Sequence, residues 1–264
     1  MKRLIALLLA VAMVLGLSTA LADEDTWDCP NCGKQGNKGL FCPECGEKKP
    51  EEPVVTEAPA GTDIKPGDYV YLGQYEQDNN TNSTEKIEWL VIDVKDGKLF
   101  LLSKLGIARH RFNNKSDGKC WGDCELRGWL NSDFYNSAFS SAEKDAIQTT
   151  QVDDGPDQTN PAWDKAGRYS KTEDKIFLLS YQEMNTLVSS SDRMCEPSYY
   201  VTALGVYTEK HNGHMCCWYW LRTSAFKNNA GVVDANGEYS TCYIHHDYGV
   251  VRPACWVDAS AVTK

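Results

Sequence analysis

The stretch IEWLVIDVKDGKLFLLS, residues 87–103, decides the fold class. Residues 87–94 and 98–103 are rich in β-branched and large apolar side chains, which favour strands. Between them, Asp96-Gly97 favours the left-handed backbone that a two-residue hairpin loop requires. The stretch therefore predicts two antiparallel strands joined by a tight turn.

More strands are predicted on both sides of this hairpin. The upstream sequence Tyr-Val-Tyr-Leu-Gly predicts a strand at 69–73, followed by a polar loop at 76–85. The downstream strands, with an Asn236-Gly237 turn among them, are expected at 176–179, 217–223, 231–234, 238–244 and 249–256.

Short helices are predicted between these two groups of strands. Leu126, Trp129 and Leu130 recur at the spacing of one helix face. Two capping boxes mark further helix starts: Ser140 with Glu143, above Ala146 and Ile147, and Ser180 with Glu183, where Leu179 and Met184 would form a hydrophobic staple. Without a parallel βαβ rhythm, the pattern predicts an α+β fold with antiparallel strands, short helices and long loops.

The N-terminus has the features of an export signal. Lys2 and Arg3 precede an apolar run at 4–17, and Ala20-Leu21-Ala22 offers small residues to a signal peptidase. The apolar run is short for a membrane span, so residues 1–22 are interpreted as a cleaved signal peptide; an uncleaved anchor is the alternative. The mature chain is then expected to be secreted or extracytoplasmic, either free or associated with the cell surface, without a stable membrane span.

Residues 23–49 are predicted to form a zinc ribbon. Two Cys-Pro-x-Cys-Gly motifs place four thiolates at Cys29, Cys32, Cys42 and Cys45. Glycine after the second cysteine allows a positive φ, so that backbone N–H groups can point at the sulfurs. Four thiolate ligands close the coordination of a structural Zn²⁺ and leave no position for a substrate. Two disulfides, or a rubredoxin-like iron site, are the alternatives.

A Pro- and Glu-containing linker is expected at 50–62, a large domain at 63–258 and a tail at 259–264. The formal net charge of −10 disfavours binding to nucleic acids and to anionic membranes.

A resemblance covers nearly all of the large domain. It is carried, in order, by Trp121, Leu126-Arg127-x-Trp129-Leu130-Asn131, Phe134-Tyr135, Ala138-Phe139-Ser140, Glu143-Lys144, Phe177-Leu178-Leu179-Ser180, Glu183, Trp220-Leu221-Arg222-Thr223 and Gly249-Val250-x-Arg252-Pro253-Ala254. This order of blocks resembles the bacterial, mainly clostridial, domain of unknown function 6273 family. The resemblance implies a C-type-lectin-like fold, the group that also contains formylglycine-generating enzymes, and supplies no catalytic residues. Cys124 stands where the family usually has a serine helix cap.

The long polar loops favour a binding module for an extracellular glycan or protein surface. The predicted ligand-binding residues are Phe226, Asn228, Asn229, His245, His246, Asp247 and Tyr248. A Ca²⁺ ion is a possible cofactor at Asp153, Asp154, Asp157 and Asn160. The alternatives are a metal- or thiol-dependent enzyme using His211, His214, Cys216 and Cys217, and a structural envelope component.

Two expectations concern cysteine and arginine. Seven cysteines follow the ribbon, an odd number, and Cys242 and Cys255 are candidates for a disulfide between neighbouring strands. Arg127, Arg222 and Arg252 are embedded in apolar blocks and are expected to brace loops through carbonyl contacts, because guanidinium offers five donors.

Overall fold

The computed structural model describes residues 28–29, 31–37, 42–45, 63–80, 82–154, 169–225 and 228–264. The chain divides into two compact units between Ala58 and Pro59, and each is described by itself. The predicted signal peptide and linker lie outside the described residues. Within the described ranges, no helix combines the length and apolar character needed to cross a membrane.

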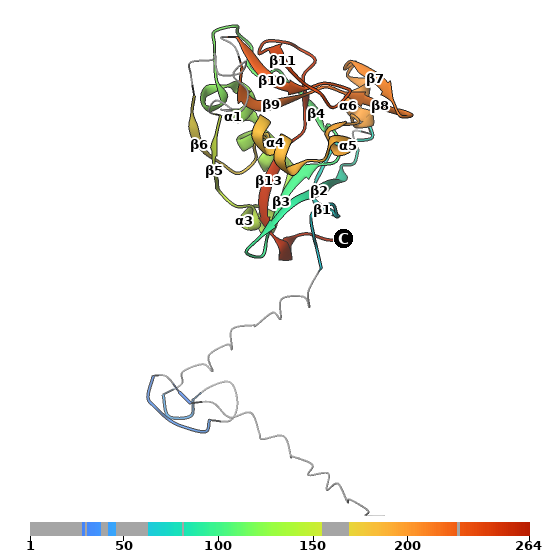
Figure 1. Cartoon of the computed structure of the whole chain (residues 1–264). Helices are drawn as coiled ribbons and strands as arrows, with labels where there is room; N and C mark the ends of the chain where they lie inside the picture. The colour runs from blue at the N-terminus through green and yellow to red at the C-terminus, as the bar shows by residue number, and fades with distance from the viewer. Residues whose placement is uncertain are drawn as a thin grey trace, which may run out of the picture. The chain divides into compact units, whose positions relative to one another are not determined.

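The larger unit is a mixed α+β domain, mostly strands with a few short helices (Figure 1), as the sequence predicts. One sheet has the order β1-β2-β3-β13 and a second the order β11-β10-β9-β12-β4, beside the ribbons β5-β6 and β7-β8. The strands are β1 (Tyr69–Tyr75), β2 (Glu85–Lys95), β3 (Lys98–Ser103), β4 (Ala108–Arg109), β5 (Thr150–Asp153), β6 (Lys171–Asp174), β7 (Thr208–His211), β8 (His214–Cys217), β9 (Tyr219–Ser224), β10 (Asn229–Val233), β11 (Tyr239–Tyr243), β12 (Val250–Val251) and β13 (Ala254–Asp258).

The predicted hairpin is confirmed as β2 and β3. Lys95 pairs with Lys98, and the turn residues Asp96 and Gly97 have φ values of 52° and 72°, the left-handed backbone expected of them. Strand β3 also pairs with β13, where Ala254 lies opposite Leu102. The hairpin therefore forms the centre of a sheet that the end of the chain completes.

The helices are short, and two of them begin at the two predicted capping boxes. They are α1 (Glu125–Trp129), the π-helical turn η2 (Leu130–Phe134), α2 (Tyr135–Ala138), α3 (Ser141–Ala146), α4 (Tyr181–Leu187), α5 (Ser190–Arg193) and α6 (Tyr199–Ala203), with 3₁₀ turns η1 (Trp121–Asp123) and η3 (Ala259–Ala261). Both predicted capping boxes are present, before α3 and before α4. Leu179 and Met184, the expected staple of α4, are both buried.

The strand predicted at 176–179 is wrong. Phe177 makes a single bridge to Ala254 instead of a ladder. The neighbouring backbone groups bond to side chains: Asn131 accepts from the amides of Lys175 and Ile176, and Arg222 donates to the Leu178 carbonyl at 2.7 Å. Because these groups are satisfied, the apolar run is buried without a strand partner.

Each of the two segments predicted as one strand, 217–223 and 249–256, contains parts of two strands. Trp218 separates β8, in a ribbon, from β9, in the five-stranded sheet. Arg252-Pro253 separates β12, in the five-stranded sheet, from β13, in the four-stranded sheet. Proline has no N–H for a ladder, so the chain leaves one sheet there and enters the other.

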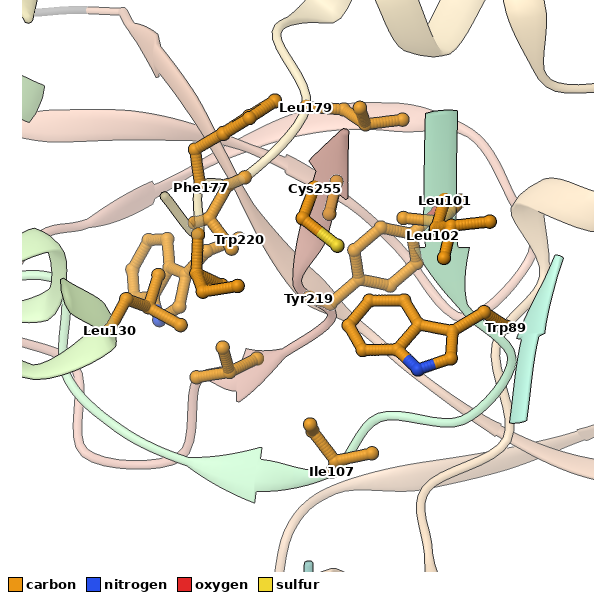
Figure 2. Close-up of a cluster of buried hydrophobic side chains, with 14 of the residues drawn as sticks. Trp89, Leu101, Leu102, Ile107, Leu130, Phe177, Leu179, Tyr219, Trp220 and Cys255 are labelled. Atoms are coloured by element: carbon orange, nitrogen blue, oxygen red, sulfur yellow. The ribbon is translucent and has the colours of Figure 1, made fainter. Parts of the chain in front are cut away.

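One hydrophobic cluster joins the two sheets (Figure 2). Trp89, Leu101 and Leu102 come from the four-stranded sheet, and Tyr219 and Trp220 from the five-stranded sheet. The buried indole N–H groups of Trp89 and Trp220 donate to carbonyls, at 2.8 and 2.9 Å. A Cβ on Gly249 would lie 1.8 Å from Trp220 Nε1, so only glycine fits against this indole.

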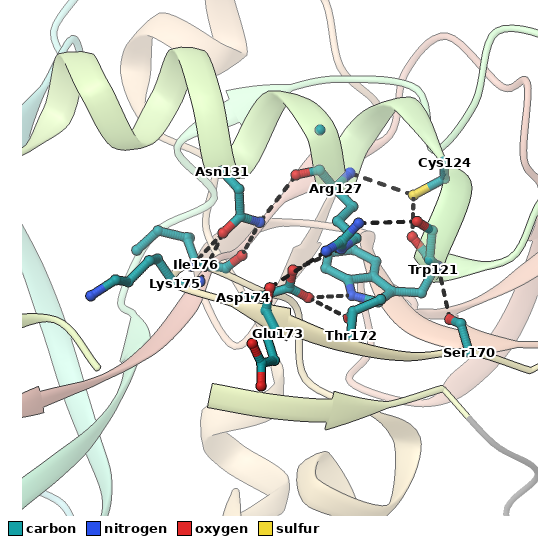
Figure 3. A network of polar contacts seen from close by, with 12 residues as sticks. Trp121, Cys124, Arg127, Asn131, Ser170, Thr172, Glu173, Asp174, Lys175 and Ile176 are labelled. Carbon is teal, nitrogen blue, oxygen red and sulfur yellow. Dashed lines mark hydrogen bonds and ion pairs between the residues drawn. The ribbon is translucent and has the colours of Figure 1, made fainter. Parts of the chain in front are cut away.

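A buried polar network fixes the helix that follows Cys124 (Figure 3). The carboxylate of Asp174 accepts from Trp121 Nε1 at 2.8 Å, Arg127 Nε at 2.7 Å and Thr172 Oγ1 at 2.7 Å. Arg127 also donates to the Gly122 carbonyl at 3.0 Å. The network thereby holds η1 and α1 against β6.

The predicted bracing role of the three arginines is confirmed. Besides Arg127, the buried Arg222 donates to the carbonyls of Leu178 and Asp153 and to the carboxylate of Glu183, which also caps α4. Arg252 donates to the carbonyls of Ser103 and Asp192, at 2.9 and 2.8 Å.

Two further expectations are corrected. Residues 259–264, expected to be a tail, fold back onto the domain: Thr263 and Tyr71 bond through both of their backbone N–H groups, so the two ends of the domain meet. Cys242 lies in β11 and Cys255 in β13, which belong to different sheets, and the two thiols are not joined. A disulfide between them would need the sheets to rearrange.

Removal of the Asp174 carboxylate tests the network. We expect Asp174→Ala to lower the free energy of unfolding by about 3 kcal/mol, because it leaves Arg127 and the Trp121 indole without their acceptor. Urea unfolding followed by circular dichroism measures the change, with the exposed neighbour Glu173→Ala as a control that stays within about 0.5 kcal/mol of the parent. Equal stabilities for both variants would contradict the role given to Asp174.

Cys124 is the cap of α1, and its thiol gives a second prediction. Its Sγ accepts from the Arg127 amide at 3.4 Å and donates to the Trp121 carbonyl at 3.3 Å. Because a hydroxyl makes both bonds more strongly, Cys124→Ser should stabilise the domain by up to about 1 kcal/mol, whereas Cys124→Ala should destabilise it by a similar amount. Thermal unfolding ranks the two variants, and a serine variant less stable than the alanine variant would refute the cap.

Candidate functional site

The four N-terminal cysteines converge, as predicted, on one point. Their sulfurs all lie within 4.8 Å of one another, and the Cys29–Cys45 and Cys32–Cys42 pairs are each 3.5 Å apart. Four thiolates around Zn²⁺, at about 2.3 Å from the metal, place their sulfurs about 3.8 Å apart. The cluster can therefore bind a metal such as zinc.

Backbone N–H groups close the first Cys-x-x-Cys turn and support the thiolate form of Cys42 in the second. Gly33 has φ of +73°, as predicted, and its N–H closes the first turn onto the Cys29 carbonyl at 2.9 Å. Desolvation opposes ionisation of Cys42, but the N–H groups of Glu44 and Cys45 donate to its sulfur and lower its pKa to about 7. A Lys34–Glu44 ion pair at 2.8 Å links the two turns. The four thiolate ligands, and the backbone bonds and ion pair that hold the two turns, all fit a structural zinc site.

A second candidate site is a groove of about 250 Å³ on the large domain, here called the aromatic groove. It is lined by Tyr207, Glu209, Trp218, Val232, Asp234, Ala235, Asn236, Ser240, Thr241, Cys242 and His246. Tyr207 is exposed and Trp218 is half-buried. Strands β10 and β11 lie at the end of the domain away from the C-terminus (Figure 1). The groove thus combines aromatic rings with hydroxyl, amide and carboxylate groups.

The structure brings the two predicted binding loops together. Asn229 pairs with Tyr243 across β10 and β11, and the Ile244 amide donates to the Asn228 carbonyl at 3.0 Å. The side chains of the loop after β11 point in different directions. His246 packs edge-on against Trp218, with ring centroids 5.5 Å apart, and against Tyr248 at 5.8 Å.

The other predicted loop residues point elsewhere. Asp247 forms an ion pair with Arg111 beside a neighbouring groove, and His245 packs against Tyr243 at 5.8 Å. Phe226 lies outside the described residues. Of the predicted loop residues that the structure describes, His246 alone lines the aromatic groove, and the ligand-binding prediction itself stays untested.

A third candidate, the thiol groove, has a volume of about 370 Å³. Its walls include His211, His214, Glu196, Cys216 and the buried Arg252. His214 Nδ1 lies 3.0 Å from Glu196 Oε1, but the Cys216 thiol contacts the backbone carbonyl of His214, at 4.0 Å, rather than its ring. Burial, with the negative charge of Glu196, raises the pKa of Cys216, so this thiol is not activated as a nucleophile.

Asp154, expected as a calcium ligand, has a different role. It is buried, and its carboxylate accepts from the amides of Trp121 and Ser170 and from Ser224 Oγ. Burial raises its pKa despite these donors. Asp157 and Asn160 lie outside the described residues. Within the described ranges, the only other ligand-type cluster is Glu76, Asp78 and Glu85, whose carboxylates accept from amides of their own loop.

Sequence analysis missed most of the aromatic groove. Tyr207 and Glu209 come from the start of the β7–β8 ribbon, which was not predicted, although Asn212-Gly213 is a hairpin turn signal. Asp234, Asn236 and Ser240 surround the predicted Asn236-Gly237 turn. The Asn236-Gly237 turn signal was therefore the available indication of this part of the groove.

The fold and the sites define a class: a mixed α+β domain accompanied by a four-cysteine cluster that can hold a metal. Residues 96–259 match the family described as Domain of unknown function (DUF6273). Because the match covers more than half of the 264 residues, the chain belongs to this family. No match was found among curated proteins or among solved structures. The matched region begins in the β2–β3 turn, so β1 and β2 complete its sheet from outside it.

The zinc site gives a direct prediction. The purified chain should contain about one zinc per molecule, and Cys42→Ser should lose it, because three thiolates and a hydroxyl bind the ion more weakly. Inductively coupled plasma mass spectrometry measures the zinc content per chain. The control is Cys242→Ser, which lies outside the cluster and should retain the metal. Zinc-free parent protein with paired N-terminal sulfurs would contradict the assignment.

Proposed function

We propose that this protein is an exported or cell-surface binding module that holds an uncharged glycan in the aromatic groove. In this proposal the zinc ribbon is structural or docks the chain to another protein. In this proposal the family domain has a C-type-lectin-like fold, which is supported by the two sheets, the short helices and the pairing of the two ends of the domain through Tyr71 and Thr263. Export rests on the signal-like sequence at 1–22.

The observation that carries the proposal is the chemistry of the groove. Sugars present apolar C–H faces and a rim of hydroxyls, so their sites combine aromatic rings with oxygen acceptors and amides. Trp218 and Tyr207 supply rings in the aromatic groove, Glu209 and Asp234 supply carboxylates, and Asn236 supplies an amide. The two carboxylates disfavour anionic ligands, which suits an uncharged glycan.

The rigidity of the groove supports the same function. The Trp218 ring packs against two other rings: that of the buried Trp220, with centroids 5.0 Å apart, and that of His246. Asp234 Oδ1 accepts from the amides of Asn236 and Glu238 and holds the β10–β11 turn. A site held by packed rings and a braced turn loses little entropy when a ligand binds.

The thiol-dependent enzyme is less well supported. In the thiol groove the imidazole of His214 pairs with Glu196, while the Cys216 thiol faces a carbonyl and has a raised pKa. A nucleophile without a base in reach is a poor catalyst. The groove geometry therefore favours binding over catalysis.

Glycan arrays, followed by titration of tryptophan fluorescence with the glycans that score, test the proposal. Trp218→Ala should weaken binding at least tenfold, because loss of a stacking ring costs about 1.5 kcal/mol or more. Tyr199→Ala removes an exposed aromatic ring outside the groove and should bind like the parent.

Two outcomes would count against the proposal. One is that the folded protein binds no glycan on the arrays and captures a protein ligand in pull-downs instead. The other is glycan binding that Trp218→Ala leaves unchanged.

A further inference from the structure

Two cysteines outside the zinc cluster lie directly opposite each other. Cys195 and Cys217 form an isolated antiparallel bridge, in which the Cys217 amide donates to the Cys195 carbonyl at 2.8 Å. Directly opposed, hydrogen-bonded residues of antiparallel strands have Cα atoms about 5.5 Å apart. That separation lies in the middle of the range, about 4.4–6.8 Å, that a disulfide spans.

Their side chains meet on the same side of the bridge. A Cβ on Gly106 would lie 3.5 Å from Cys217 Sγ and 3.7 Å from Cys195 Sγ, so both sulfurs occupy the space that this glycine leaves open. Both residues are fully buried. Cys217 Sγ donates to the Cys195 carbonyl at 3.3 Å, and Cys195 Sγ donates to the Glu196 carbonyl at 3.5 Å.

The surroundings favour a thiolate on one of the two sulfurs. Burial opposes ionisation of Cys195, but the neighbouring Cys217 thiol and the positive charge of Arg252 lower its pKa below the usual value. Burial and the neighbouring Cys195 raise the pKa of Cys217. A thiolate beside a thiol is the arrangement from which thiol–disulfide exchange proceeds.

The other described cysteines of the domain have different surroundings. Cys120 Sγ donates to Asp123 Oδ1 at 3.4 Å, and Cys124 Sγ donates to the Trp121 carbonyl at 3.3 Å. Cys216 is the sequence neighbour of Cys217, but its thiol contacts the His214 carbonyl and lines the thiol groove. Cys242 and Cys255 lie in different sheets, as described above. Of the seven described cysteines after the ribbon, the pair formed by Cys195 and Cys217 has the geometry for a bond.

We propose that Cys195 and Cys217 are a structural disulfide pair that closes under oxidising conditions by exchange with a disulfide-bearing oxidant. Two S–H bonds are lost and one S–S bond forms. The two protons and two electrons pass to the oxidant's disulfide, whose S–S bond breaks to give two thiols. The proposal goes beyond glycan binding and concerns how the segment that builds the grooves is held.

The disulfide would join the two ends of the segment 195–217 and so restrict its movement. Residues 195–217 include α6 and the β7–β8 ribbon, and supply Glu196, His214 and Cys216 to the thiol groove. The same segment supplies Tyr207 and Glu209 to the aromatic groove, and Trp218 follows it at once. Arg252, which donates to Tyr219 Oη at 3.2 Å, lies next to both sulfurs and to the start of β9.

The decisive experiment uses the full chain, refolded with zinc in a buffer of reduced and oxidised glutathione. Free thiols are alkylated in denaturant, and peptides are mapped by mass spectrometry with fragmentation that separates Cys216 from Cys217. We expect one linked peptide pair, Cys195 with Cys217. Alkylation of both residues, or a Cys195–Cys216 link, would overturn the proposal. Because refolding needs neither export nor a glycan, this result is independent of the proposed function.

Stability measurements on the same refolded protein provide a second readout. Cys195→Ala, Cys217→Ala and the double variant should each lower the melting temperature by about 8 °C, because all three lose the same cross-link. The parent refolded with zinc under reducing conditions should melt with them. Cys216→Ala and Cys242→Ala, the matched controls, should keep the link. Losses that add in the double variant, with a parent insensitive to reduction, would contradict the cross-link.

Discussion

The Arg252 guanidinium lies where the chain passes from β12 to β13, and therefore from one sheet to the other. It is buried, and it donates to the carbonyl at the end of β3, to the end of α5 and to the hydroxyl of Tyr219 in β9. A buried charge is tolerated only when its donors are satisfied, so these partners must keep their positions. Packing of the two sheets, and the thiol groove that Arg252 lines, depends on this constraint.

Arg127, Arg222 and Arg252 each satisfy backbone carbonyls that have no partner in a sheet. The domain has long connections whose carbonyls cannot all join a ladder, and a guanidinium offers enough donors to satisfy several of them. Arg222 serves the segment after β6, and Arg127 serves the turn before α1. The grooves are built on connections that such contacts hold, which gives loop-built sites a defined shape.

The local predictions succeeded where a few neighbouring residues decide the structure. Asp96-Gly97 turns the chain, Ser140 and Ser180 cap helices, and the two Cys-x-x-Cys motifs gather their sulfurs. The predictions failed where a distant partner decides. The apolar run at 176–179 was predicted to be a strand, yet Asn131 and Arg222 take its backbone bonds. Cys242 and Cys255 were expected to be neighbours, yet their strands belong to separate sheets.

By itself, the sequence determined the α+β class, the hairpin, the helix caps, the metal cluster and the bracing role of the arginines, because each depends on residues close in the chain or on the chemistry of one side chain. Only the tertiary structure decided which loops meet. It placed Trp218 beside His246 and Asp234, and Cys195 opposite Cys217. These contacts are set by how connections distant in the chain pack beside the strands, and no local pattern encodes that packing.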